Sequence, residues 1–212
     1  MTMRENTLPE SYFTRLDDSS DHEFYNEPRK VVHIDGPAIA ALENYYARHV
    51  PAHGIYLDMM SSWRSHIPPS LDPISVVGLG MNAEEMDDNP QLDEFIIHDL
   101  NVTPMLPYPD NRYDAVLCAV SVQYLKHPVK VFKDVYRVLK PDGIFIVSFS
   151  NRYFPTKTVS VFMNSSDDEL IDLVQQYYVL AGGFINIKHK KVTPSDGDPL
   201  YIVSGIKYAE DI

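Results

Sequence analysis

Short runs of apolar residues recur along this chain, and they constrain its fold more than any other feature of the sequence. Each run is continuous rather than alternating, which is typical of strands covered on both faces, as in parallel sheets. The runs lie at 55–57, 74–77, 95–97, 113–120 and 144–149. Two last strands are expected at 184–192 and 200–207, and the turn-rich segment between them favours an antiparallel pair.

Segments with the apolar periodicity of a helix separate some of these runs. One helix is expected from Pro37 onward and another over 128–140, with Pro141-Asp142-Gly143 as its stop. A third should begin at Ser166, since Ser166 and Glu169 have capping-box spacing, and should end at two glycines. The order predicts an α/β fold: a doubly wound, mostly parallel seven-stranded, Rossmann-like sheet with an antiparallel C-terminal hairpin.

The length of 212 residues, with 44% hydrophobic and 23% charged residues, fits one globular domain with an appendage. Residues 1–34 are polar and acidic but carry a few aromatic anchors. They are expected to form a partly ordered N-terminal extension. Residues 35–212 are expected to form the main domain.

A net charge of −12 is the wrong sign for a surface that neutralises phosphates, so nucleic acid and anionic membranes are not expected as partners. No apolar stretch reaches the ~18 residues of a membrane span, and no signal-peptide core follows the first residues. The only cysteine, Cys118, lies in an apolar run and is expected to be a buried thiol. These features favour a cytoplasmic protein.

In open α/β sheets, ligands bind beyond the carboxyl ends of the strands, so the loops after the strands are the candidate sites. The segment 78–83, GLGMNA, satisfies the dinucleotide pattern G-x-G-x-x-A, and Asp99 lies near the offset of a ribose-binding acid. The pattern requires a long helix directly afterwards, whereas 83–90 offers only one or two acidic turns. Asn82 and Glu85 have capping-box spacing for that short helix, and Glu85 is expected to point outward.

The stretches LPYPDNRYD at 106–114 and VFKDVYRVLKPDG at 131–143 carry a stronger signal. They resemble class I S-adenosylmethionine-dependent methyltransferases, specifically the type-11 methyltransferase domain, and the resemblance runs from about residue 55 to residue 149. It implies the class I methyltransferase fold, S-adenosylmethionine as cofactor and methyl transfer as the reaction. It does not supply the methyl acceptor.

The cofactor loops depart from the family pattern. Family members carry an acid and then three alternate glycines after the first strand; here Asp58 is retained, but Met60, Ser62 and Arg64 replace the glycines. The acid that grips the ribose falls on Gly80, whereas Asp99 matches the acid that contacts adenine. Weakened or lost cofactor binding is therefore expected. Ser61, Ser62 and Asn82 are candidate substitutes for the missing groups. With them, the expected cofactor-binding residues are Asp58, Met59, Met60, Ser61, Ser62, Gly78, Leu79, Gly80, Asn82, Asp99, Leu100 and Ala119.

Methyl transfer gains mainly from holding donor and acceptor in line, and a base is needed only for a poorly ionised acceptor. His66 and His33 are the candidate bases, a small-molecule acceptor is favoured, and no metal site is expected from the histidine spacing. Three alternatives stay open. Asp58 and Asp99 could simply cap loops, the protein could be a catalytically inactive binding protein on this fold, and it could be an NAD(P)-binding oxidoreductase. The sequence does not indicate the oligomeric state.

Overall fold

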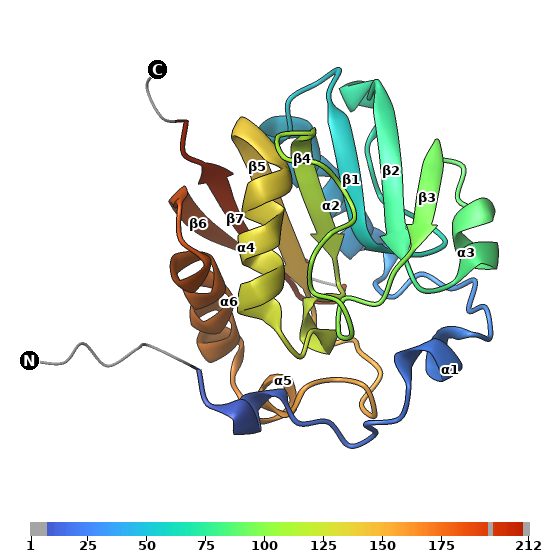
Figure 1. The fold of residues 1–212 in the computed structure, drawn as a ribbon, viewed down its shortest axis with the longest axis vertical. Helices are drawn as coiled ribbons and strands as arrows, with labels where there is room; N and C mark the ends of the chain where they lie inside the picture. The colour runs from blue at the N-terminus through green and yellow to red at the C-terminus, as the bar shows by residue number, and fades with distance from the viewer. Residues whose placement is uncertain (1–7, 195–196, 210–212) are drawn as a thin grey trace, which may run out of the picture.

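The computed structural model describes residues 8–194 and 197–209, and its centre is a seven-stranded sheet of order β3-β2-β1-β4-β5-β7-β6 (Figure 1). Strands β1 to β5 run parallel, and β7 lies antiparallel between β5 and β6. The predicted doubly wound sheet and its C-terminal hairpin are confirmed. The strands are β1 (Ile55–Ser61), β2 (Ser75–Gly80), β3 (Glu94–Ile97), β4 (Tyr113–Ala119), β5 (Leu139–Phe149), β6 (Phe184–Val192) and β7 (Leu200–Lys207).

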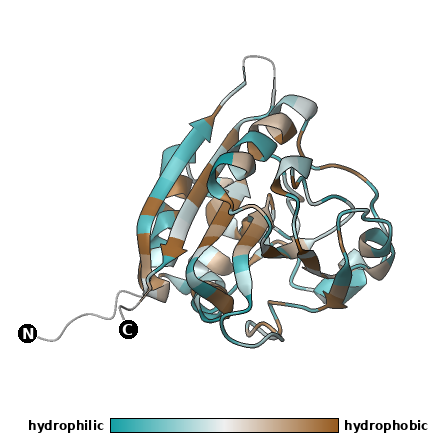
Figure 2. Ribbon diagram, turned by 90° about the horizontal axis from the view of Figure 1, so that it is seen from above, coloured by the Kyte–Doolittle hydropathy of each residue, from teal (hydrophilic) through white to brown (hydrophobic). Residues whose placement is uncertain are grey.

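Helices cover both faces of the sheet at its central strands, and this is why β1, β2, β4 and β5 are mostly buried and apolar, whereas β3 and β6 at the two edges are largely exposed. Helix α2 (Gly36–His49) packs on one face, where Leu42 and Tyr46 are fully buried. Helices α4 (Pro128–Val138) and α6 (Asp167–Ala181) pack on the other, around Phe132 and Tyr178. Figure 2 shows hydrophobic residues along the strands of this three-layer arrangement and on the helix sides that face them.

Local signals set the helix ends. The Asp35 carboxylate accepts the Ala38 N–H at 3.0 Å at the start of α2. At the start of α6, the Ser166 N–H donates to Glu169 at 2.8 Å, as predicted. Helix α4 ends earlier than expected, at Val138, because Leu139 already pairs with Tyr113 in the sheet.

Residues 8–33, here called the N-terminal strap, cross the edge of the sheet where the parallel strands end (Figure 1). The strap contains a short 3-10 helix, Glu10–Phe13, and α1 (Asp21–Tyr25). The predicted extension therefore docks on the domain from residue 8 onward, while its residues 1–7 lie outside the described part. The remaining short helices are Pro69–Leu71, α3 (Ala83–Asp87), Val122–Tyr124 and α5 (Ser160–Asn164).

Lys157 fastens the strap to the loop between β5 and α5. Its side chain is fully buried, and its ammonium group lies 3.1 Å from the Asp17 carboxylate and 3.4 Å from the Asp21 carboxylate. The same ammonium donates to the Ser19 carbonyl oxygen at 2.8 Å. Within residues 8–194 and 197–209, no helix is long and apolar enough to cross a membrane.

Candidate functional site

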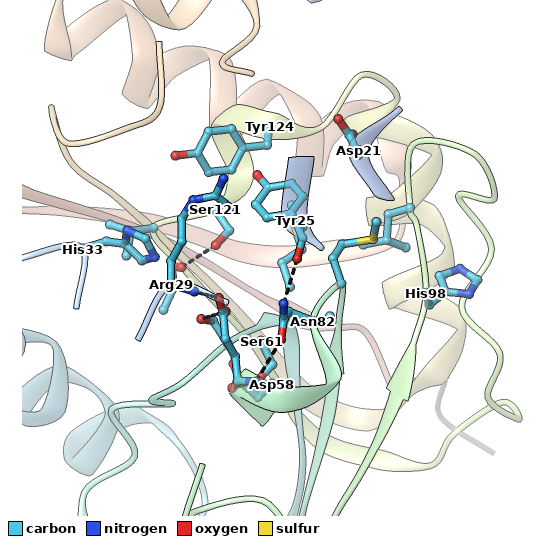
Figure 3. A pocket seen from close by; sticks show the side chains of 18 of the residues that line it. Asp21, Tyr25, Arg29, His33, Asp58, Ser61, Asn82, His98, Ser121 and Tyr124 are labelled. Atoms are coloured by element: carbon cyan, nitrogen blue, oxygen red, sulfur yellow. Dashed lines mark hydrogen bonds between the residues drawn. The ribbon is translucent and has the colours of Figure 1, made fainter. Parts of the chain in front are cut away.

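A cavity lies at the carboxyl ends of β1, β2 and β4, under the N-terminal strap (Figure 3). The strand order reverses between β1 and β4, and such a switch point is where open α/β sheets bind ligands. The space between the lining atoms is about 1030 Å³, part of it open to solvent. Its lining includes Arg29, His33, Asp58, Met60, His66, Asn82, Glu85, Asp99, Tyr124 and Phe154.

The loop after β1 folds around Asp58. This carboxylate is buried and accepts the Ser61 hydroxyl at 2.5 Å and the Ser65 hydroxyl at 2.7 Å. Burial raises the pKa of Asp58 to about 6, although the two hydroxyl groups oppose that shift. Asp58 therefore does what the loop-capping alternative proposed, and it also lines the cavity.

Met60 stands where the family pattern has its first glycine, and its φ is +60°. A side chain in this left-handed region costs ~1–2 kcal/mol. His66 at +55° and Val120 at +43° also line the cavity in this conformation. Strained residues gathered around one cavity are typical of functional sites.

Gly80 ends β2 with no space for a side chain. A Cβ added there would collide with the Ser61 carbonyl oxygen and lie 2.9 Å from the Met86 sulfur. An acid at this position is therefore excluded by the path of the loop after β1. Since α3 spans only Ala83–Asp87, the glycine pattern also lacks the long helix of a dinucleotide site.

Glu85 points into the cavity, so the expectation that it points outward is wrong. It is buried, accepts the Ser62 hydroxyl at 2.5 Å and also accepts the backbone N–H of Arg29. Only one half of the predicted capping box forms, because Asn82 accepts the Glu85 N–H at 3.0 Å while the Glu85 carboxylate is engaged elsewhere.

Asn82 ties the strap to the site. Its side-chain amide donates to the carbonyl oxygens of Tyr25 at 2.8 Å and Asn26 at 3.1 Å, and Figure 3 shows the bond to Tyr25. Together with the bond between Arg29 and Glu85, these contacts roof the cavity with the strap. No local pattern predicts the inward orientation of Glu85 or the strap contacts, because the partners are far apart along the chain.

Asp99 follows β3 and lines the cavity. One of its oxygens, Oδ1, accepts the N–H groups of Asn101 at 2.8 Å and Val102 at 3.3 Å. Asn101 in turn donates to the Tyr124 carbonyl oxygen at 2.9 Å. Asp99 thus caps its own loop with one oxygen while it lies at the site.

His33 and His66, the two candidate bases, both line the cavity. Burial lowers the pKa of His66 to about 4, and His33 and Arg64 add to the effect. Burial also lowers the pKa of His33, which the Glu85 carboxylate opposes. Both imidazoles are therefore neutral at neutral pH.

The structure does not bring every implied cofactor residue to the cavity. Met59 and Leu79 are buried in the core, and Gly78 lies against Leu92. Trp63 packs under the Arg64 guanidinium, 3.9 Å from its ring centroid, rather than over the cavity. The implied residues that do line it are Asp58, Met60, Ser61, Ser62, Gly80, Asn82, Asp99, Leu100 and Ala119.

The part of the chain that matches a known protein family lies within the sheet. Residues 74–147 match the family model of a methyltransferase domain. The chain is 37% identical over 67 residues to the ubiquinone/menaquinone biosynthesis C-methyltransferase UbiE of Chromobacterium violaceum, a match that covers 30% of this chain and 28% of that protein. It is 31% identical over 71 residues to the biotin biosynthesis bifunctional protein BioHC of Teredinibacter turnerae, covering 34% and 12%. The matches thus span less than a third of these curated relatives.

Solved structures share the whole architecture. One is found in the complex between the Haloferax volcanii Trm112 methyltransferase activator and a methyltransferase, with a TM-score of 0.62 and 14% identity over 83% of this chain and 92% of that one. Another is an S-adenosylmethionine-dependent methyltransferase from Mesorhizobium loti, with a TM-score of 0.57 and 14% identity over 82% and 99%. At this identity the likeness shows the fold.

Proposed function

We propose that this chain, which belongs to the class I S-adenosylmethionine-dependent methyltransferase superfamily, methylates a small molecule in the cavity beneath its N-terminal strap. The observation that carries the proposal is the place of the cavity, at the switch point between β1 and β4, with Asp58 within β1 and Asn82 and Asp99 just after β2 and β3. A single buried thiol, Cys118, fits our further proposal that the protein works in the cytoplasm.

The charges around the cavity fit the cofactor. Asp58, Glu85 and Asp99 all line it, and none has a lysine or arginine within 4.0 Å among the described residues. Carboxylates without cationic partners in a partly desolvated space favour a cationic ligand. The sulfonium of S-adenosylmethionine is such a cation.

Three groups of residues would hold the cofactor. Asp99, which keeps one carboxylate oxygen outside its own loop cap, would bind the adenine end. Asn82, just before α3, and Glu85 on α3 would take the place of the acid that Gly80 cannot carry. Asp58 and the hydroxyls around it would face the charged sulfonium end of the molecule. The cofactor supplies the methyl group as an electrophile.

The protein's own contribution is to exclude water and to hold a proton acceptor. The strap closes over the cavity through Asn82 and Glu85, and a closed site aligns donor and acceptor. His33 and His66 are neutral, so the unprotonated ring nitrogen of whichever imidazole faces the acceptor can take its proton.

Binding of S-adenosylhomocysteine to Asp99 variants tests the proposal. Asp99→Asn keeps an oxygen for the loop cap but removes the charge, so affinity should fall by about tenfold while the melting temperature holds. Asp93→Asn is the matched control, since Asp93 also caps a backbone N–H, that of Val76, but lies outside the cavity. Equal affinity in the Asp99 variant and the wild type would remove Asp99 from the site.

One observation favours the second candidate, a binding protein without catalysis. The loop after β1 spends both the Ser61 and Ser65 hydroxyls on Asp58 and presses its backbone against Gly80. In this second candidate, such a loop would bind the cofactor but would not hold its methyl group in line with an acceptor. Tight binding of S-adenosylhomocysteine with no methyl transfer to any of a broad panel of acceptors would favour this candidate.

A further inference from the structure

We propose that the methyl acceptor carries an oxyanion, a carboxylate or a phosphate, and that this group pairs with the guanidinium of Arg29. The inference rests on the proposed function, because it assigns the substrate class of the same cavity. The Arg29 side chain has a buried N–H donor that no described residue of the protein accepts.

Arg29 belongs to the N-terminal strap, and its backbone fixes it over the cavity by donating to the Glu85 carboxylate. Its side chain extends into the cavity toward Tyr124 (Figure 3). The guanidinium carbon lies 4.3 Å from the ring centroid of Phe24 and 5.5 Å from that of Phe154. Two rings therefore hold the planar group in place, and its N–H edges stay free to bind.

The Nη1 atom of Arg29 is buried and has no hydrogen-bond partner among the described residues. Among the described residues, no carboxylate oxygen lies within 4.0 Å of the Arg29 guanidinium. The guanidinium groups of four other arginines each pair with an aspartate or glutamate: Arg15, Arg112, Arg137 and Arg152. A desolvated donor of this kind is costly unless a partner arrives. A ligand that brings a carboxylate or phosphate supplies one, and the guanidinium fork matches both groups.

The neighbours of Arg29 place it at the acceptor end of the cavity. Phe154 follows β5 and Tyr124 follows β4, and their rings stack at 6.1 Å between centroids. Asp99 follows β3, on the other side of β1 and β2 in the sheet order. The acidic residues Asp58, Glu85 and Asp99 thus line the part of the cavity proposed for the cofactor. The Arg29 guanidinium lies beyond that part, where the acceptor would bind.

The same region offers a surface for an apolar body beside the anion. The His33 ring meets Phe154 edge-on at 5.4 Å, so an imidazole, a phenyl ring and a guanidinium converge. His33 is neutral because burial lowers its pKa, so Arg29 is the cation of this group of side chains and the unprotonated nitrogen of His33 can accept a proton. The expected acceptor is a flat molecule with a carboxylate or phosphate near the methylated atom.

Titrations of the protein saturated with S-adenosylhomocysteine test this inference. The probes are benzoate, phenyl phosphate and inorganic phosphate, with benzamide as the neutral analogue of benzoate. The wild type should bind an anionic probe and prefer benzoate to benzamide. Arg29→Met should weaken the anionic probes by about tenfold or more and abolish that preference. Whichever of benzoate and the phosphates binds more tightly identifies the anion.

Two controls separate binding from folding. Arg112→Met removes an arginine that also lies over two rings, at 5.2 Å from Tyr108 and Tyr113, but that pairs with Glu94 outside the cavity. It should leave every probe unchanged. Arg29→Met should melt no lower than the wild type, since it removes an unpaired buried donor. Should it fail to fold, Arg29→Lys keeps the charge without the fork and should still weaken benzoate.

Each of three results would overturn the inference. The wild type could bind no anionic probe, or the Arg29 variants could bind the probes as tightly as the wild type does. In the third result, Arg29→Met weakens the binding of S-adenosylhomocysteine but not that of 5′-methylthioadenosine. The last result would assign the guanidinium to the amino-acid end of the cofactor. A different result would refute the proposed function but support the anion site: the wild type binds neither S-adenosylhomocysteine nor 5′-methylthioadenosine, yet it binds an anionic probe that Arg29→Met does not bind.

Discussion

The Ser61 carbonyl oxygen occupies the place where a side chain on Gly80 would begin. Gly80→Asp should therefore not rebuild the family's ribose clamp. We expect it to lower the free energy of unfolding by about 1–3 kcal/mol, as overpacking does, and to leave S-adenosylhomocysteine affinity no tighter. Urea unfolding and calorimetric titration measure the two effects. Gly36→Ala is the control, because no atom lies within 4 Å of its added Cβ; a stable, tighter-binding Gly80→Asp would contradict the described path of the loop.

Asp58 should make the protein less stable as the pH rises. Its pKa of about 6 lies above the unfolded value of 3.8, so the stabilising, protonated form is complete below about pH 4 and lost as the pH rises through about 6. The charged form costs about 3 kcal/mol at neutral pH. Asp58→Asn should therefore gain stability over the wild type at about pH 8 and not at about pH 4. Urea unfolding at the two pH values checks this, and an equal difference at both would refute it.

Because the backbone of Met60 is left-handed, a glycine variant at this position should be more stable than an alanine variant, the reverse of the usual order of stability. Met60→Gly should be about 1 kcal/mol more stable than Met60→Ala, since only glycine adopts φ of +60° without strain. The control pair is at Val179, an exposed position in α6, where alanine should exceed glycine by about 1 kcal/mol. The free energies of unfolding of the four variants decide it, and alanine ahead of glycine at both positions would show that residue 60 carries no strain.

Lys157 should hold the strap closed. Lys157→Met leaves Asp17 and Asp21 without this buried ammonium and should cost about 3 kcal/mol. It should also expose residues 8–33 to protease and weaken the binding of S-adenosylhomocysteine. Lys126→Met is the control, because its pair with Asp18 is partly exposed and contributes under about 1 kcal/mol.

Limited proteolysis followed by mass spectrometry locates the cut in these lysine variants. Cleavage within residues 8–33 that is equally slow in the wild type and in Lys157→Met would show that Lys157 does not secure the strap. Faster cleavage in Lys157→Met, suppressed again by saturating S-adenosylhomocysteine, would link closure of the strap to occupation of the cavity.

The fold was predictable because its signals are local. Continuous apolar runs follow from strands covered on both faces, and the Ser166–Glu169 pair begins α6 within four residues. Glu85 shows the limit of this reasoning. Its spacing from Asn82 predicted a reciprocal cap, but the Ser62 hydroxyl and the Arg29 N–H, which are remote in sequence, bind its carboxylate instead.

The site was predictable only where a strand end positions the residue. Asn82 and Asp99 follow β2 and β3, Asp58 lies within β1, and all three line the cavity. The strap could not be placed from its sequence, because a polar, acidic segment gives no periodic signal, and the buried ammonium of Lys157 that holds it comes from a distant loop. The crowding at Gly80 could not be predicted for a similar reason, since the obstacle to a side chain there is the backbone of another segment.

Calorimetric titration of the wild-type protein with S-adenosylmethionine, S-adenosylhomocysteine and NAD(P) shows whether the cavity is an adenosyl cofactor site. We expect saturable binding of both adenosyl ligands at one site and no saturable binding of NAD(P). We also expect the affinity for S-adenosylmethionine to rise relative to that for S-adenosylhomocysteine as the pH rises through about 6, because Asp58 then becomes a carboxylate that attracts the sulfonium. Saturable binding of NAD(P) alone, or of no adenosyl ligand, would contradict this assignment of the cavity.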